Sequence, residues 1–497
     1  MDFLDPRRKR SHTIRLITGY VLVSIAIGLA TIILVYAAYG YGINTKTGEI
    51  IQNGIVFVSS KPTGAELYLN GQDQNATTGR RLVLEAGNYT LTLKKSGYRD
   101  WQRQFTLDEH SIARYTYPLL FPVKPRVTNL MAFSSMPPLM TETPDQHWLL
   151  VQAPSAGLDS VNFDEFDTTN LTKPSVNLSL PAGLLSGDDK DTASLVALEW
   201  SSDNSHLLLR HDFSGSNEFI LFDRAHPSDS INLNKQLKTD PSQVALRNKK
   251  SNQVYFYDAA SQSLTSVSTS QTSLPTPFLK QVLAFKSYGS NTIVYATAKD
   301  APTGKVEVRI WDNGQTYLLD TVQTGDHYLI DTAQYQGTSY FVSGSDTDPN
   351  INIYKDPLSY LKNSTIGKAV PTLAINQVGS TNLSFSTKAR FIEVENGQQF
   401  GVYDFETQQV YQYKLATPPT SPLVWMDGQR LIGDTDGNVF VTDYDSTNQQ
   451  SLTPTVDMTG GLFSADYNHL LTIQPTSTNV FELVNVDLRA GTDLPKQ

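Results

Sequence analysis

The sequence predicts a protein that is all-β except for one transmembrane helix near its N-terminus. Three observations support this fold class. The run Leu16–Tyr39 contains no charged residue, long helical patterns are scarce elsewhere, and short apolar segments separated by Gly, Pro, Asn and Asp recur from about residue 54 onward. Such segments are typical of strands joined by tight turns. With 497 residues, the chain is long enough for an anchor and more than one folded domain.

Residues 1–15 are predicted to be a cytoplasmic tail too short to fold, and residues 16–39 a transmembrane helix. As a helix this run is about 36 Å long, whereas the hydrocarbon core of a bilayer is about 30 Å thick. The basic residues before it are Arg7, Arg8, Lys9, Arg10 and Arg15. Because basic flanks stay in the cytoplasm, residues 40–497 are predicted to be extracytoplasmic, on a single-pass protein of the cell membrane. A cleaved signal peptide is the alternative, but Ala37-Ala38-Tyr39-Gly40 is a poor cleavage site.

The composition excludes several kinds of chemistry. The chain has no cysteine, which excludes disulfides, thiolate metal sites and cysteine nucleophiles. Its formal net charge is -10, and the clearest basic cluster is the one before the apolar run. A nucleic-acid partner is therefore not expected, because no basic stripe is present to neutralise phosphates.

Residues 40–53 read as a polar juxtamembrane linker, and residues 54–120 as a small antiparallel β-sandwich. Its predicted strands are Ile55–Ser59, Ala65–Leu69, Arg81–Leu84, Tyr89–Lys94, Arg103–Leu107 and Ile112–Leu119. Lys61-Pro62-Thr63-Gly64 and Asn70-Gly71 are strong turn signals between them.

This block contains, in order, Ser60–Gly71, Leu82–Leu84, Ala86–Tyr89 and Lys94–Tyr98. The ordered set resembles the PEGA domain of bacterial and archaeal envelope proteins. Pro-Thr-Gly-Ala stands where the family reads Pro-Glu-Gly-Ala, and Thr78-Gly79-Arg80 where a Gly-x-Thr-Pro turn is common. The resemblance implies an extracytoplasmic β-sandwich without catalysis. Its motif residues, for which structural roles are predicted, are Pro62, Gly64, Ala65, Gly71, Gly87, Tyr89, Gly97 and Tyr98.

Residues 121–130 carry two prolines and are predicted to be a stiff linker. From residue 131 to 497 a unit of three apolar strands recurs, and its third strand ends in an apolar or aromatic residue plus Asp. The eight marks of this kind are Phe166-Asp167, Phe222-Asp223, Tyr257-Asp258, Trp311-Asp312, Tyr354-Lys355 (which departs from the pattern), Tyr403-Asp404, Thr442-Asp443 and Val486-Asp487. Their spacing of roughly 35 to 56 residues brackets the period of propeller blades, so a β-propeller of seven or eight blades is predicted. A pair of β-sandwiches is the alternative.

No catalytic, cofactor-binding or metal-binding residue is predicted. The eight histidines lack zinc-site spacing, and only His206 and His211 lie near each other in sequence. The remaining candidates read as turns or solvated loops: the calcium-loop-like segments Asp434–Asn438 and Ser345–Asp348, and the carboxylate pairs Asp164 with Glu165 and Asp188 with Asp189.

The predicted function is binding. The chain reads as a membrane-anchored scaffold of a prokaryotic cell envelope, whose propeller presents a face to an envelope protein or polysaccharide and which needs no cofactor. Two alternatives stay open: a propeller glycosidase or lyase acting on envelope polysaccharide, and a structural component of a cell-surface layer.

Overall fold

The computed structural model describes residues 6–38, 41–43, 50–187, 194–363, 369–456, 460–477 and 480–494. The chain divides into two compact units, Met1–Lys124 and Pro125–Gln497. The predicted carboxylate pair Asp188 with Asp189 lies outside the described residues, as do residues 40 and 44–49 of the predicted linker 40–53.

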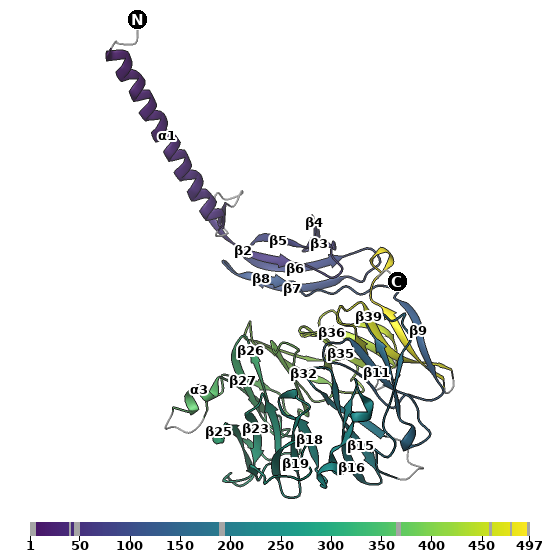
Figure 1. The fold of residues 1–497 in the computed structure, drawn as a ribbon. Coiled ribbons are helices and arrows are strands. Elements are labelled where there is room, and N and C mark those ends of the chain that lie inside the picture. Colours follow the sequence, from purple (N-terminus) through teal and green to yellow (C-terminus); the bar gives the residue numbers. More distant parts are fainter. Residues whose placement is uncertain are drawn as a thin grey trace. The chain divides into compact units, whose positions relative to one another are not determined.

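Helix α1 (Pro6–Ala38) contains the apolar stretch Thr13–Tyr36, which by length and composition is able to cross a bilayer and is not buried by the rest of the described chain (Figure 1). Two hydroxyls in this stretch are satisfied within the helix, because Thr18 and Thr31 donate to the carbonyl oxygens of Ile14 and Ile27 at 2.9 and 2.8 Å. The helix begins ten residues before the predicted Leu16. The basic residues from Arg7 to Arg10 are therefore helical, and the predicted tail is mostly part of α1.

The first unit also holds a sandwich of two four-stranded sheets. One sheet contains β1 (Tyr41–Ile43), β2 (Ile50–Val58), β5 (Arg80–Glu85) and β8 (Ile112–Tyr115), and the other β4 (Gln72–Thr77), β3 (Glu66–Leu69), β6 (Gly87–Lys94) and β7 (Trp101–Leu107). Two predictions need correction. Strand β2 begins at Ile50, inside the predicted linker, because β1 pairs with it. Strand β8 runs parallel to β2, since the chain arrives from β7 in the opposite sheet.

The second unit contains eight four-stranded sheets within its described residues. Sheets 1 to 3 comprise β10 (Met140–Glu142), β11 (Trp148–Gln152), β12 (Asn162–Asp167) and β13 (Val176–Ser179); β14 (Ser194–Trp200), β15 (His206–Phe213), β16 (Ser216–Asp223) and β17 (Ile231–Asn232); and β18 (Gln243–Leu246), β19 (Gln253–Asp258), β20 (Ser263–Ser268) and β21 (Leu279–Lys280). Sheets 4 to 6 comprise β22 (Ala284–Tyr288), β23 (Thr292–Thr297), β24 (Lys305–Asp312) and β25 (Gln315–Gln323); β26 (Asp331–Tyr335), β27 (Thr338–Ser343), β28 (Asn350–Lys355) and β29 (Leu373–Asn376); and β30 (Asn382–Phe385), β31 (Phe391–Glu395), β32 (Gln399–Asp404) and β33 (Gln409–Lys414). Sheets 7 and 8 comprise β34 (Val424–Trp425), β35 (Arg430–Thr435), β36 (Asn438–Asp443) and β37 (Gln450–Pro454); and β38 (Leu462–Phe463), β39 (His469–Ser477), β40 (Val480–Asp487) and β9 (Arg126–Phe133). Short helices connect some of them: α2 (Leu233–Leu237), α3 (Pro357–Leu361), η2 (Leu158–Ser160), η3 (Pro227–Asp229), η4 (Arg247–Lys249) and η5 (Gly491–Asp493).

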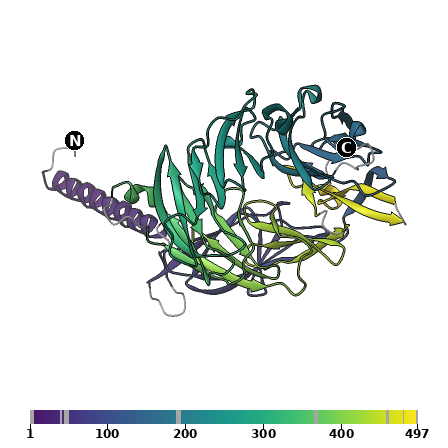
Figure 2. The ribbon, with the colours of Figure 1, turned by 90° about the horizontal axis from the view of Figure 1, so that it is seen from below.

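The sheets stand in a ring, which Figure 2 shows from below. Within each of the first seven sheets, consecutive strands pair in antiparallel order. The first strands of neighbouring sheets contact one another, as β14 does with β18, β22 with β26 and β26 with β30. The first strands therefore line the axis of the ring, which is the arrangement of a β-propeller.

Sheet 8 closes the ring with strands from both ends of the second unit. Strand β9 pairs with β40 in antiparallel register, with Val127 opposite Val486, and Figure 1 shows blue β9 beside the yellow C-terminal strands. The predicted linker 121–130 therefore ends earlier than expected, because Arg126 already belongs to a strand of the propeller.

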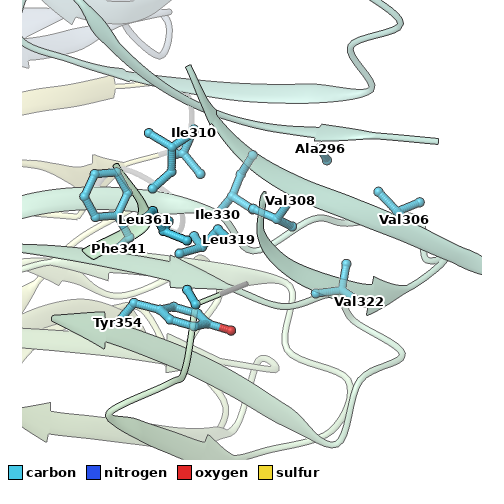
Figure 3. Close-up of a cluster of buried hydrophobic side chains, with 12 residues drawn as sticks. Ala296, Val306, Val308, Ile310, Leu319, Val322, Ile330, Phe341, Tyr354 and Leu361 are labelled. Carbon is cyan, nitrogen blue, oxygen red and sulfur yellow. The ribbon is translucent and has the colours of Figure 1, made fainter. Parts of the chain in front are cut away.

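Apolar clusters join neighbouring sheets around the ring. Between sheets 4 and 5, Val308 and Ile310 of β24 pack with Phe341 of β27 and Tyr354 of β28 (Figure 3). A similar cluster joins sheets 8 and 1. Burying each such side chain contributes about 1.5–3 kcal/mol, so the sheets stabilise one another although each is small.

Seven of the eight predicted marks end the third strand of a sheet, from Asp167 of β12 to Asp487 of β40. The prediction for Tyr257-Asp258 is wrong, because this mark ends β19, the second strand of sheet 3. The third strand there is β20, which ends in Ser268 and so lacks the signal.

Candidate functional site

A cavity of about 700 Å³ opens on the axis of the second unit. Its walls come from the first strands β14, β18, β22 and β26 of four consecutive sheets and from η4. We call it the axial pocket. Side chains on the exposed face of these innermost strands have no neighbouring strand to cover them, so the ring geometry itself directs them into the pocket.

Glu199 and Lys249 form one side of the axial pocket. The Lys249 ammonium pairs with one carboxylate oxygen of Glu199, and the backbone N–H of Leu246 donates to the other. Glu199 is thereby fixed between two neighbouring sheets. Its carboxylate is already occupied by protein donors, which suits a structural acceptor better than a proton-transferring group.

Asp331 and Lys286 form a second charged pair of residues in the pocket. The carboxylate of Asp331 accepts a hydrogen bond of 2.8 Å from the backbone N–H of Thr332. Burial raises the pKa of Asp331, and the nearby charges of Lys286 and Lys249 counteract part of that increase. Lys286 is exposed and has no ion pair within the described part of the chain.

Two large side chains complete the ligand-accessible surface. Tyr288 and Leu198 line the pocket and are 39% and 37% exposed. The pocket therefore combines an ammonium group without an ion pair among the described residues, a carboxyl group whose pKa is raised by burial, and a small apolar surface. Such a mixture suits binding of a polar ligand that carries an anionic group.

A buried carboxyl also lies on the first strand of sheet 1, away from the residues of this pocket. Burial raises the pKa of Glu142 to about 8. Its Oε1 accepts from Gln146, and its Oε2 has no hydrogen-bond partner within the described residues.

The predicted motif residues of the first unit lie in turns and in its core. Gly64, Gly71 and Gly97 have φ values of 76°, 80° and 82°, which favour glycine. The remaining motif residues are Pro62 at the turn before β3, Ala65 and Tyr98 in the core, Gly87 at the start of β6, and Tyr89, which stacks on Phe105 and donates to the Glu85 carbonyl.

Sequence reasoning missed the residue that fixes the main turn of this motif. The hydroxyl of Thr78 accepts from the backbone N–H groups of Gly64 and Ala65 at 3.1 Å each, and lies 2.8 Å from the Ser60 hydroxyl. Thr78 is thirteen residues from Ala65 in sequence. The sequence signal for this role was Thr78 itself, in the Thr78-Gly79-Arg80 segment that differs from the common Gly-x-Thr-Pro turn of the family.

Several of the other sequence candidates have protein partners. Glu165 pairs with Arg224 at 2.6 Å, and Asp434 accepts from Ser421 at 3.1 Å. Asp436 and Gly437 form the hairpin turn between β35 and β36, as predicted. Asp348 accepts from Ser345 at 2.9 Å.

His206 and His211 both lie on β15 but have different partners. The Nδ1 of His211 lies 2.9 Å from Glu218 Oε1 in the core, and hydrogen bonds hold the pKa of Glu218 down at about 2 against the effect of its burial. His206 Nε2 lies 3.5 Å from Asp223. No local sequence pattern indicates Asp331, Lys286 or Tyr288 as pocket residues, because strands remote in sequence supply the walls of the pocket.

Residues 53–119 match the family model of the PEGA domain. The second unit is similar in fold to several propellers of known structure. They include the Dos1 propeller (14% identity, 73% of this chain and 95% of that chain covered, TM-score 0.42), the β-propeller domain of Cps50 (Swd1) from Myceliophteria thermophila (9%, 73% and 99%, 0.36), and an oligogalacturonate lyase from Vibrio parahaemolyticus (12%, 74% and 99%, 0.38). At these identities and scores the similarities carry no argument about function. No curated protein matches the chain in sequence.

The match confirms the predicted PEGA domain, and the ring of sheets confirms the predicted propeller. The chain is thus a propeller protein with a PEGA domain and a helix that is a candidate membrane anchor.

Proposed function

We propose that the chain is a membrane-anchored binding protein of a prokaryotic cell envelope, with its N-terminus in the cytoplasm and residues 40–497 outside. The apolar length of α1 and the basic residues at its start support this topology. The propeller would hold its partner in the axial pocket. That partner is an envelope molecule that carries a carboxylate, either a polysaccharide or a protein segment.

The observation that carries the proposal is the convergence of four sheets on one pocket with an unpaired ammonium group. Lys286 is exposed and makes no ion pair among the described residues, and Tyr288 and Leu198 offer contact area beside it. A charge-assisted hydrogen bond from Lys286 to a carboxylate would orient the ligand. Asp331 would accept hydrogen bonds from hydroxyl or amide groups when ionised.

The test uses full-length protein in nanodiscs. Isolated envelope polysaccharide and, separately, solubilised envelope proteins are offered to it, and retention and polymer breakdown are both measured. We expect retention without breakdown, and loss of retention in Lys286→Gln. Lys280→Gln, which removes an exposed lysine outside the pocket, is the matched control. Breakdown of the polymer would favour the enzyme alternative, and self-association without ligand retention would favour a structural layer protein.

A further inference from the structure

Three potential metal ligands meet where the chain passes from β16 to β17 in sheet 2. Ligand atoms of Asp223, His226 and Asp229 all lie within 4.8 Å of one another. His206, at the start of β15, adds a second imidazole: its Nε2 lies 3.5 Å from Asp223 Oδ2, and the Nδ1 of His226 lies 3.9 Å from that same oxygen. One carboxylate oxygen therefore faces two imidazole nitrogens.

Comparison with the other sheets shows that this arrangement is unusual within the chain. An Asp ends the third strand in several sheets, and a lysine or arginine usually pairs with it. Asp167 pairs with Lys173, Asp312 with Lys362, Asp404 with Arg390 and Asp487 with Arg126, at 2.6 to 2.8 Å.

Asp223 is at the equivalent position, but its ion pairs among the described residues are with the two histidines alone. A second carboxylate, that of Asp229, lies close by instead of a lysine or arginine. Two carboxylates so close repel each other unless a cation neutralises them. Imidazoles and carboxylates are residue types that ligate divalent transition metals.

The local geometry orients the donor atoms. His206 Nδ1 lies 2.7 Å from the Ser205 hydroxyl, which leaves Nε2 directed at Asp223. Asp223 Oδ1 accepts from the backbone N–H groups of Ala225 and His226 at 2.9 Å each, which leaves Oδ2 for a metal. In a tetrahedral zinc site with bonds of about 2 Å, the ligand atoms lie about 3.3 Å apart. The observed 3.5 and 3.9 Å to Asp223 Oδ2 are close to this value, and the ligand atoms of Asp223, His226 and Asp229 lie within 4.8 Å of one another.

We propose that Asp223, His226 and Asp229 form a binding site for a divalent transition metal of the zinc class, with His206 beside Asp223 as a further donor. This inference does not depend on the axial pocket, because none of the four residues lines it.

The experiment titrates metal-free full-length protein in detergent micelles with Zn²⁺ by calorimetry, and with Co²⁺ by visible absorption. We expect one saturable equivalent of Zn²⁺, a tetrahedral Co²⁺ spectrum and a higher Tm with zinc. His226→Ala and Asp229→Asn each weaken zinc binding at least about tenfold and abolish the Co²⁺ spectrum. His226 is 72% exposed on its side chain, so its replacement leaves the fold intact, which the Tm without metal checks.

The matched control is His147→Ala. His147 lies 3.3 Å from Asp167 at the equivalent place in sheet 1, where Lys173 already neutralises the carboxylate. This variant should bind zinc like the wild type. The proposal is overturned if the wild type shows no saturable binding, or if His226→Ala and Asp229→Asn bind zinc as tightly as it does.

Discussion

The buried carboxyl groups Glu393 and Glu395 should make the stability of the propeller depend on pH. Both lie on β31, two residues apart and therefore on one face of the strand, and both are almost completely buried. Burial raises the pKa of Glu395 to about 6. Burial, and then the charge of Glu395, raise the pKa of Glu393 well above its usual value.

The direction of the effect follows from these raised pKa values. A carboxyl group whose pKa is higher in the folded state is bound to its proton more tightly there than in the unfolded chain. Its stabilising contribution is therefore complete below the unfolded value of 4.5 and is lost as the pH rises past about 6. For Glu395 this difference corresponds to about 2 kcal/mol.

Glu393→Gln tests this reasoning. Its Oε1 has no hydrogen-bond partner, and its Oε2 contacts the Ser384 hydroxyl at 3.0 Å, a contact that the glutamine carbonyl can keep. Because burial raises the pKa of Glu393 well above its usual value, we expect the variant to be more stable than the wild type at pH 8. At pH 4.5 the two proteins should be nearly equal.

The assay is urea unfolding of the full-length protein in detergent, followed by tryptophan fluorescence at pH values from 4.5 to 8. Trp425 reports on the site directly, because its indole N–H donates to Ser384 Oγ at 3.0 Å. Glu482→Gln, which removes a partly exposed carboxylate of β40, is the control. A difference between Glu393→Gln and the wild type that is the same at pH 4.5 and pH 8 would refute the reasoning.

Three further substitutions test the packing and closure of the ring by urea unfolding. Gly433→Ala should destabilise the propeller by about 1–3 kcal/mol, since the new Cβ would lie 2.5 Å from Leu423 Cδ2. In the control Gly428→Ala the new Cβ has no atom within 4 Å, so stability should change little. Phe341→Ala should lower the free energy of unfolding by about 3–5 kcal/mol, because it leaves a cavity between sheets 4 and 5. Val370→Ala, at an exposed position, is its control and should change the free energy of unfolding by less than about 0.5 kcal/mol. Equal decreases in the two variants would contradict the packing described. Arg126→Ala removes a charge-assisted hydrogen bond of 2.6 Å to the buried Asp487 and should cost about 1.5–3 kcal/mol, whereas breaking the exposed pair of Arg210 with Asp212 should cost less than about 1 kcal/mol.

The local parts of the fold could be predicted from sequence, because the signals lie within a few residues of the structure they determine. Asn70 and Gly71 both have positive φ, as their tight turn requires. The predicted marks found the third strand in seven of eight sheets, six of them with an Asp and one with Lys355, and failed in sheet 3, where the third strand ends in Ser268. The pairing of β9 with β40 joins residues more than 340 positions apart, and no local pattern around Arg126 indicates its partner.

The candidate sites could not be predicted from the sequence, because their residues are also far apart along the chain. Lys286 and Asp331 lie on the first strands of neighbouring sheets, and only the radial arrangement of these strands brings them into one pocket. Asp223, His226 and Asp229 do carry a local signal, because His226 lies three residues from each of the two aspartates. That spacing is also common in surface turns, so it becomes informative only when His206 is found beside it.

The repeated Asp at the end of the third strand explains how one sheet can acquire a different chemistry without loss of the fold. In sheet 6, Asp404 accepts two hydrogen bonds from Arg390 and so ties the end of β32 to the start of β31. In sheet 2, the imidazole of His206 can make the equivalent contact with Asp223 between the two strands. Because the apolar clusters between sheets supply most of the stability, a weaker side-chain interaction at one strand end is tolerated. The position is then free to change its partners, and in sheet 2 the partners present are those that bind metals.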